Sequence, residues 1–214
     1  MAHVFLRLRV GGREHLDGVR GPVIFAANHQ SHFDTPAILL SVPHRWRSRL
    51  AVAMAKEFFD AHFLPERHGV FERLTASALY FLAVLFFNAF PLPRAGPGAR
   101  DTLRYAGELA TAGQSILIFP EGHRTEGGEI NRFQHGVGMM ASRLRLPVIP
   151  VRLEGLDRVL HHTRRWPRRG AVRVTFGAAL HLEGDDYAAL AQRVEQAVIR
   201  LLPEPVKPAH PNAA

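Results

Sequence analysis

The sequence predicts an α/β protein with a mixed, largely parallel central sheet flanked by helices. Short apolar runs typical of strands alternate with helical segments along the chain. Two of these runs, 23–27 and 115–119, end abruptly in polar loops. The 214 residues, 47% hydrophobic and 21% charged, suit one sizeable core. We therefore expect a single domain over residues 1–202, followed by a Pro-rich tail over 203–214.

Seven segments have the apolar pattern of strands. The first, Val4 to Val10, alternates apolar and polar residues as a half-buried strand does, and Gly11 and Gly12 end it. The others are short apolar runs bounded by turn or polar residues. They are 23–27, 50–55, 90–92, 115–119, 147–153 and 172–176.

Helices are expected between most of these strands. Thr35 is a suitable N-cap because Pro36 follows at the first helical position. Gly113 suits the C-terminal end of a helix over 99–112. A last amphipathic helix is expected to start after Asp185-Asp186 and to run to residue 202. Further helices are predicted over 74–87 and 136–145.

The helix over 74–87 belongs to an uncharged stretch that extends from Leu74 to Pro93. Asn88 and Pro91 interrupt the far end of this stretch, so the helix is expected to end near Phe87. Its length is then roughly 21 Å at 1.5 Å per residue, short of the roughly 30 Å hydrocarbon core of a bilayer. We expect a buried or half-immersed helix.

Composition restricts the function further. The absence of cysteine excludes disulfides, thiolate metal sites and Cys nucleophiles. The net charge of +8 favours an anionic partner, such as phospholipid head groups or a phosphorylated substrate or carrier. Aromatic residues fall mostly in apolar runs and not among the arginines, which argues against a single-stranded nucleic-acid platform.

The polar loop after the second strand, Asn28 to Asp34 (NHQSHFD), contains a candidate catalytic pair, His29 and Asp34. Five positions on a helix correspond to roughly 140° of rotation, so the two side chains meet only if the segment is a turn. A carboxylate on one imidazole nitrogen leaves the other as a general base. Two alternatives stay open: loop residues held by the backbone, or a hydrolytic metal site formed by His29, His32 and Asp34.

A second polar loop, Phe119 to Thr125 (FPEGHRT), follows another buried strand. If the two strands are parallel, both loops lie at the same edge of the sheet, where open α/β sheets bind ligands. Gly122 lets the backbone approach a ligand closely. Arg124 offers a planar guanidinium that suits phosphate, and Glu121 can orient Arg124 or bind a hydroxyl.

Together and in this order, the motifs resemble those of the lysophospholipid and glycerol-phosphate acyltransferases. NHQSHFD resembles the first block, a His and an Asp separated by four residues (HX4D). NAFPLPR, ending in Arg94, is similar to the second, and FPEGHRT to the third. Residues 146–151 resemble the fourth block. The likeness extends over roughly residues 5 to 180.

The resemblance implies roles for these residues. His29 would be the general base on the acceptor hydroxyl, with Asp34 as its orienting partner. The acceptor's phosphate and glycerol would be bound by Arg94, Glu121, Gly122 and Arg124. The donor would be an acyl thioester on coenzyme A or acyl carrier protein, which is a co-substrate, and no cofactor or metal is expected. The enzyme would be cytoplasmic and peripherally or monotopically associated with an anionic phospholipid membrane.

The chain departs from the family pattern at several points. Asn88 stands where the second block commonly has Gly, and Gln134-His135-Gly136 lacks a Lys that is common before the Gly. The hydrophobic N-terminal helices of many family members are absent, so we expect a soluble variant or part of a larger protein. A metal-dependent hydrolase and a non-catalytic module that binds anionic lipids remain the alternative functions.

Overall fold

The computed structural model describes residues 6–55, 66, 69–92, 99–125, 128–159 and 170–201. The predicted acceptor ligand Arg94 and the predicted tail over 203–214 lie outside these residues. The start of the first predicted strand, at Val4, also lies outside them.

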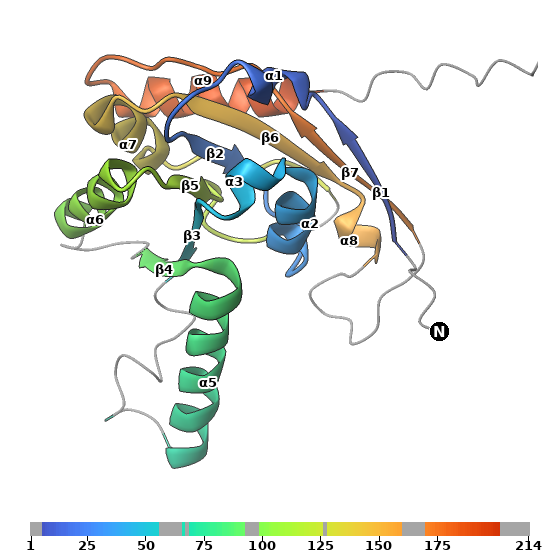
Figure 1. The fold of residues 1–214 in the computed structure, drawn as a ribbon, viewed down its shortest axis with the longest axis vertical. Helices are drawn as coiled ribbons and strands as arrows, with labels where there is room; N and C mark the ends of the chain where they lie inside the picture. Colours follow the sequence, from blue (N-terminus) through green and yellow to red (C-terminus); the bar gives the residue numbers. More distant parts are fainter. Residues whose placement is uncertain are drawn as a thin grey trace, which may run out of the picture.

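Within the described residues, the centre of the fold is a seven-stranded sheet in the order β1-β7-β6-β2-β5-β3-β4 (Figure 1). Neighbouring strands are parallel except for β6 and β7, which are antiparallel. This arrangement confirms the predicted mixed, largely parallel sheet. The strands are β1 (Leu6–Gly11), β2 (Ile24–Ala27), β3 (Leu50–Ala55), β4 (Ala89–Leu92), β5 (Ser115–Ile118), β6 (Val148–Glu154) and β7 (Gly170–Phe176).

Helices pack on both faces of the sheet, because alternate side chains of the central strands point to opposite sides. Val23, Phe25 and Ala27 belong to one buried cluster, whereas Ile24 and Ala26 belong to the other. The first cluster is completed by α1 (Glu14–Asp17), α2 (Asp34–Ser41), α3 (His44–Arg47) and α8 (Leu156–Val159). The second is completed by α6 (Ala99–Thr111), α7 (Gly136–Leu144) and α9 (Tyr187–Arg200).

Most predicted elements appear within a few residues of their expected bounds, but the predicted start of α2 was wrong. The helix begins at Asp34, its N-cap is Phe33, and no side chain caps it. Thr35 is therefore inside the first turn and is not the N-cap. The amide of Asp34 donates to the Ser31 carbonyl at 3.2 Å, which tightens the chain before the helix.

Helix α5 (Val70–Phe87) begins four residues before the predicted start at Leu74. The prediction followed the uncharged run, whereas the helix also includes Glu72, whose carboxylate accepts from the Gly69 amide at 3.4 Å near the helix start. The short helices α1, α3 and α8 were not predicted, because four residues are too few to show a helical period.

Helix α5 ends at a tight turn that explains one departure from the family pattern. Asn88, between α5 and β4, has φ of 47°, a left-handed conformation that Gly and Asn adopt most readily. Its side chain donates to Oε1 of Gln114 at 2.8 Å. From this turn α5 extends away from the layered body of the protein (Figure 1).

Candidate active site

The loops after β2 and β5 lie side by side at the carboxyl edge of the sheet. The two strands are parallel neighbours, with Ile24 beside Ile116 and Ala26 beside Ile118. At the exit of the strands, the amide and the Oγ1 of Thr125 both donate to the His29 carbonyl, at 2.9 and 3.1 Å. The prediction that the two polar loops lie at the same edge of the sheet, here called the rim, is therefore confirmed.

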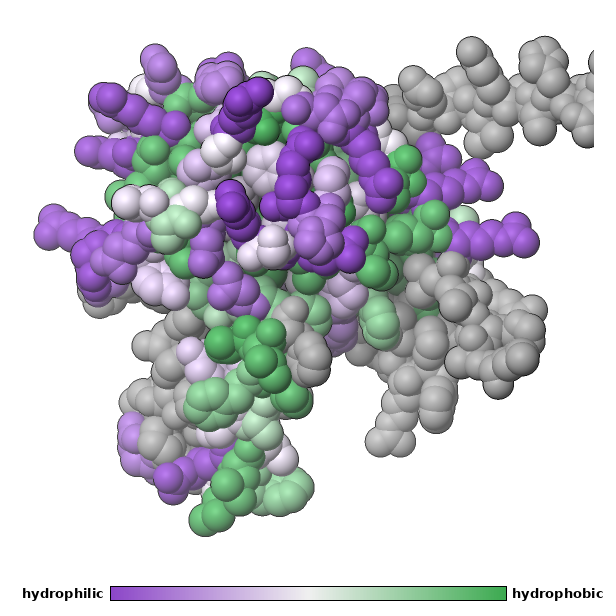
Figure 2. Space-filling model, viewed as in Figure 1, coloured by the Kyte–Doolittle hydropathy of each residue, from purple (hydrophilic) through white to green (hydrophobic). Residues whose placement is uncertain are grey.

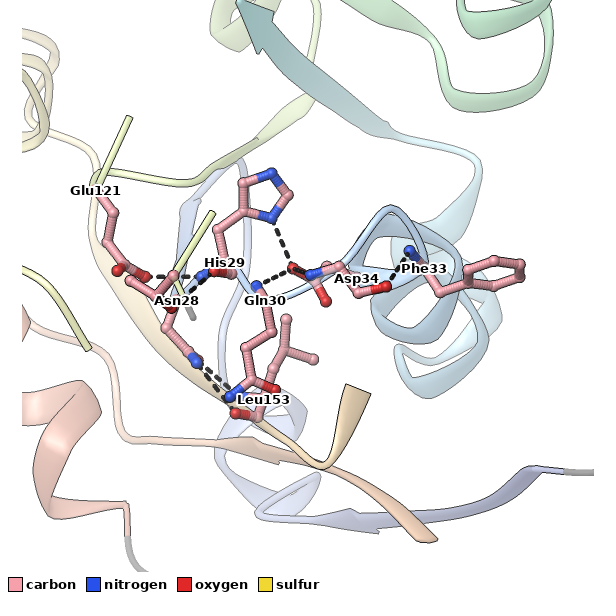
Figure 3. Close-up of polar contacts among 9 residues, drawn as sticks. Asn28, His29, Gln30, Phe33, Asp34, Glu121 and Leu153 are labelled. Atoms are coloured by element: carbon pink, nitrogen blue, oxygen red, sulfur yellow. Dashed lines mark hydrogen bonds and ion pairs between the residues drawn. The ribbon is translucent and has the colours of Figure 1, made fainter. Parts of the chain in front are cut away.

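His29 and Asp34 form a direct pair (Figure 3). Nδ1 of His29 lies 2.6 Å from Oδ2 of Asp34. Because an ionised carboxylate can only accept, this contact places the proton of the neutral imidazole on Nδ1 and leaves the lone pair on Nε2. Figure 3 shows the second ring nitrogen pointing away from Asp34. The arrangement can accept a proton from a substrate at Nε2.

Asp34 is fixed by more than the histidine. Its side chain is fully buried, and Oδ2 also accepts from the amides of Gln30 at 2.6 Å and Ser31 at 2.9 Å. As the first residue of α2, it lies where the helix dipole favours negative charge. A carboxylate held by these donors keeps its orientation while the histidine gains and loses a proton.

The imidazole of His29 is only partly covered. Its side chain is 18% exposed, and its ring stacks on Phe119 with centroids 4.2 Å apart and planes 22° apart. Stacking on Phe119 and the bond to Asp34 together fix the plane of the ring. Substrate therefore has access to a base whose direction is set in advance.

Glu121, which the family resemblance implied as an acceptor ligand, lies inside the protein. It is fully buried, Oε1 accepts from the His29 amide at 2.7 Å, and Oε2 accepts from the Asn131 amide at 2.8 Å. The pKa of Glu121 is raised from 4.5 to about 7, mainly by burial. The two amide bonds oppose this shift, and the charges of Asp34 and Glu195 contribute to it.

Gly122 and Arg124 continue the same loop. Gly122 has φ of 76°, and its amide donates to the Phe119 carbonyl at 3.1 Å, so the turn requires the left-handed conformation that Gly adopts without strain. Arg124 is half-buried and immediately precedes Thr125, whose bonds to His29 bring this part of the loop next to the base. The loop thus places the backbone of Arg124 close to that of His29.

Two further residues that the sequence analysis considered are Arg94 and His32. Arg94 lies outside the described residues. His32, the third potential ligand of the alternative metal site, is exposed. Across the ranges described here, no three His, Asp or Glu side chains are grouped so that they could hold a metal ion.

Sequence reasoning missed two residues that support the site. The side-chain amide of Asn28 donates to the Leu153 carbonyl at 3.0 Å and accepts from the Leu153 amide at 2.7 Å (Figure 3). Asn28 thus continues the pairing of β2 with β6 by one residue. The stacking of Phe119 on His29 was also missed. Both contacts join residues far apart in sequence, so only their position beside the motifs could have indicated them.

Known proteins resemble this chain in sequence. The family model described as Acyltransferase matches residues 7–154. The chloroplastic 1-acyl-sn-glycerol-3-phosphate acyltransferase BAT2 of Brassica napus is 25% identical over 157 residues, 73% of this chain and 40% of the relative. The 1-acyl-sn-glycerol-3-phosphate acyltransferase of Pseudomonas aeruginosa is 24% identical over 202 residues, 90% of this chain and 66% of the relative. The chain thus spans about two fifths of the plant relative and about two thirds of the bacterial one.

The fold also matches a solved structure. The 1-acyl-sn-glycerophosphate (LPA) acyltransferase PlsC from Thermotoga maritima superposes with a TM-score of 0.64 at 23% identity. The match covers 92% of this chain and 73% of that one. This likeness confirms the fold, and the family model covers well over half of the sequence. The chain belongs to the acyltransferase family, as its motifs predicted.

Proposed function

We propose that this protein transfers an acyl group from an acyl thioester to the hydroxyl of a lysophospholipid or glycerol-phosphate acceptor. The observation that carries the proposal is the His29–Asp34 pair, with Nδ1 and Oδ2 2.6 Å apart, beside the loop that contains Arg124. The names of the relatives, 1-acyl-sn-glycerol-3-phosphate acyltransferases, favour 1-acylglycerol-3-phosphate as the acceptor.

In the proposed reaction, His29 acts as general base. Nε2 takes the proton of the acceptor hydroxyl while the oxygen attacks the carbonyl carbon of the thioester. The resulting tetrahedral intermediate collapses, the C–S bond breaks, and the thiolate leaves with the proton returned from His29. Asp34 stabilises the imidazolium that forms between these two steps. The products are an ester and a free thiol, so no acyl-enzyme is required.

Arg124 would bind the phosphate of the acceptor, because guanidinium and phosphate form charge-assisted, often bidentate hydrogen bonds. Gly122 would let the acceptor approach the loop backbone closely. Arg94 stays a predicted second ligand from the second motif. The thioester carrier would be coenzyme A or acyl carrier protein, and both are acidic enough to suit a chain with a net charge of +8.

A thiol-release assay tests this function. Several acyl-CoA and acyl carrier protein thioesters are each combined with 1-acylglycerol-3-phosphate, glycerol-3-phosphate and a lysophospholipid without a phosphomonoester. We expect thiol release that depends on the acceptor, with the acylated product detected by mass spectrometry. Thiol release without acceptor would instead indicate a thioesterase. Activity lost on chelation and restored by zinc or manganese would support the metal-dependent hydrolase.

The position of Arg124 gives a sharper test of the acceptor site. The Arg124→Ala variant should raise KM for the phosphorylated acceptor by about 10-fold or more, as loss of a charge-assisted hydrogen bond predicts. KM for the thioester should change little. The reverse pattern would assign Arg124 to the thioester instead. Arg193→Ala is the matched control, because Arg193 is an exposed arginine on α9.

We also propose that α5 attaches the protein to a membrane surface. Its large exposed side chains lie within a sector of roughly 120° at 100° per residue. They are Val70, Phe71, Leu74, Phe81, Leu82 and Leu85, between 48% and 79% exposed. Figure 2 shows hydrophobic residues gathered along this projecting helix. No helix in the described part of the chain is long and apolar enough to cross a bilayer.

An apolar stripe of this kind suits a helix that lies in the interface plane with its apolar side among the acyl chains. The stripe from Val70 to Leu85 is about 22 Å long at 1.5 Å per residue. The net charge of +8 would add attraction to anionic head groups. Vesicle flotation checks this: binding should increase when phosphatidylglycerol is added to phosphatidylcholine vesicles and decrease with salt. Equal recovery with and without vesicles would contradict it.

A further inference from the structure

Glu121 is a fully buried carboxylate whose two oxygens are both occupied by backbone amides. The amides belong to His29 and Asn131, which lie on different segments of the chain. A buried carboxylate is unfavourable unless it is well hydrogen-bonded, so this position needs a reason. Because the side chain is fully buried, the acceptor could reach Glu121 only if the residues that cover it moved.

The contacts of Glu121 join the base to the rest of the site. Oε1 holds the amide of His29, while Thr125 holds the carbonyl of the same residue, so one loop fixes the His29 peptide on both sides. Oε2 holds the amide of Asn131, at the start of the segment that leads to α7. Figure 3 shows Glu121 reaching toward His29 from the side opposite to Asp34.

The segment after Asn131 is held in a similar way. The amide of Gln134 donates to the Pro120 carbonyl at 2.8 Å. The amide of Phe133 donates to Oε2 of Glu195, on α9, also at 2.8 Å. Glu121 is therefore the point where the loop after β2, the loop after β5 and the segment before α7 meet.

We propose that Glu121 is a positioning residue, which sets the place of His29 through its backbone and does not bind the acceptor. The inference rests on the proposed acyl transfer, in which His29 is the base. It assigns Glu121 a role different from the acceptor contact that the family resemblance implied. The ionised carboxylate accepts strongly at both oxygens, whereas protonation places a donor on one of them and weakens the amide bond there.

The surroundings of Glu121 give this contact a pH dependence. Burial is the main cause of its pKa of about 7, and the carboxylates of Asp34, from α2, and Glu195, from α9, act in the same direction. The amides of His29 and Asn131 oppose the shift. Near neutral pH one of the two amide bonds therefore strengthens or weakens as the carboxyl loses or gains its proton, and the backbone of His29 should respond.

The Glu121→Gln variant tests the role kinetically. Glutamine keeps the size but can accept at one oxygen only, so one of the two amides loses its acceptor. We expect kcat to fall by about 10- to 100-fold from misplacement of the base, with KM for the acceptor changed by less than about 2-fold. An increase of KM by 10-fold or more with kcat unchanged would overturn the proposal and make Glu121 an acceptor ligand.

A measurement on the resting protein separates this inference from the proposed function. In ¹⁵N-resolved NMR spectra, the amide resonances of His29 and Asn131 should both move with pH, with a midpoint near 7. Glu195→Gln removes a neighbouring negative charge and should lower this midpoint, whereas Glu121→Gln should abolish the shared transition. If the two amide resonances do not shift with the same midpoint in the wild type, the proposal is wrong, even if acyl transfer is found. If the two resonances shift together but no acyl transfer is found, the proposed function is wrong, whereas the role of Glu121 in holding the two amides is supported.

Discussion

At the rim of the sheet, the peptide of His29 is bonded on both sides by one loop and its ring is held by Asp34 and Phe119. Along α5, in contrast, large apolar side chains face solvent, and contact with the body is concentrated near the β4 end. The rim has buried polar groups with specific partners, whereas α5 has exposed apolar groups. Directional hydrogen bonds are needed to orient a catalytic base. A surface that meets lipid needs only apolar area, because the hydrophobic effect has no direction.

Among substitutions at the rim, the largest expected effect on kcat is that of replacing Asp34. Asp34→Asn keeps the size but removes the charge that orients His29 and stabilises the imidazolium. We expect kcat to fall by about 1,000-fold or more, as in other His–Asp pairs that lose the carboxylate. Asp186→Asn is the control, because Asp186 accepts from the Ala189 amide at the start of α9 and asparagine caps helices about as well as aspartate. Near-normal kcat in a folded Asp34→Asn variant would contradict the pairing.

The pKa of Glu121 predicts a pH-dependent stability difference. Because the pKa is raised in the folded state from 4.5 to about 7, the folded protein binds the proton more tightly than the unfolded chain does. The protonated carboxyl therefore stabilises the folded state. This stabilisation is fully present below pH 4.5 and is lost as pH rises to about 7. The free energy of unfolding of the wild type minus that of Glu121→Gln should therefore fall over this window, by up to about 3 kcal/mol. Urea unfolding at several pH values measures it, and a difference that rises with pH would contradict the assignment.

The hydrogen bonds of the Asn28 side chain predict a loss of stability of similar size. Asn28→Ala leaves the buried amide and carbonyl of Leu153 without their side-chain partner. We expect a loss of about 2–4 kcal/mol and a Tm lower by roughly 5–10 °C. Asn131→Ala is a matched control, because its side chain contacts exposed His123 while its backbone amide stays bound to Glu121. Equal Tm values for the two variants would show that the Asn28 pairing does not stabilise the rim.

The smallest effect on stability is expected along α5. The double variant Phe81→Asp and Leu85→Asp places charges where 63% and 76% of the side chains are exposed. Its free energy of unfolding should stay within about 1 kcal/mol of the wild type, because exposed positions tolerate change. Its recovery with floating vesicles should fall several-fold. The exposed Ala188→Asp on α9 is the control for charge, and vesicle binding unchanged by the double variant would rule out the stripe.

The difference between the two regions also explains what the sequence could predict. Apolar runs such as 23–27 and 115–119 located β2 and β5, and parallel pairing then brought His29 close to the third motif. The spacing of His29 and Asp34 correctly required a turn, although α2 begins at Asp34 and not after Thr35. These features depend on local pattern and on one rule of sheet topology.

Contacts between distant residues were beyond that reasoning. The bond from Glu121 to the His29 amide joins positions 92 residues apart, and that from Asn28 to Leu153 joins positions 125 apart. Nothing in the motif FPEG distinguishes a glutamate that binds substrate from one that holds a backbone. The exposure of α5 was equally hidden, because an uncharged run is compatible with a buried helix and with an exposed one.

The most direct measurement of the central claim is acyl transfer by His29→Ala under single-turnover conditions. The variant should keep the wild-type circular dichroism spectrum. Its rate constant should be at least about 1,000-fold lower, because a general base commonly contributes this much and Asp34 acts through His29. The exposed His32→Ala variant, from the same loop, should keep a rate close to that of the wild type. A folded His29→Ala variant that transfers the acyl group at a substantial fraction of the wild-type rate would show that His29 is not the base.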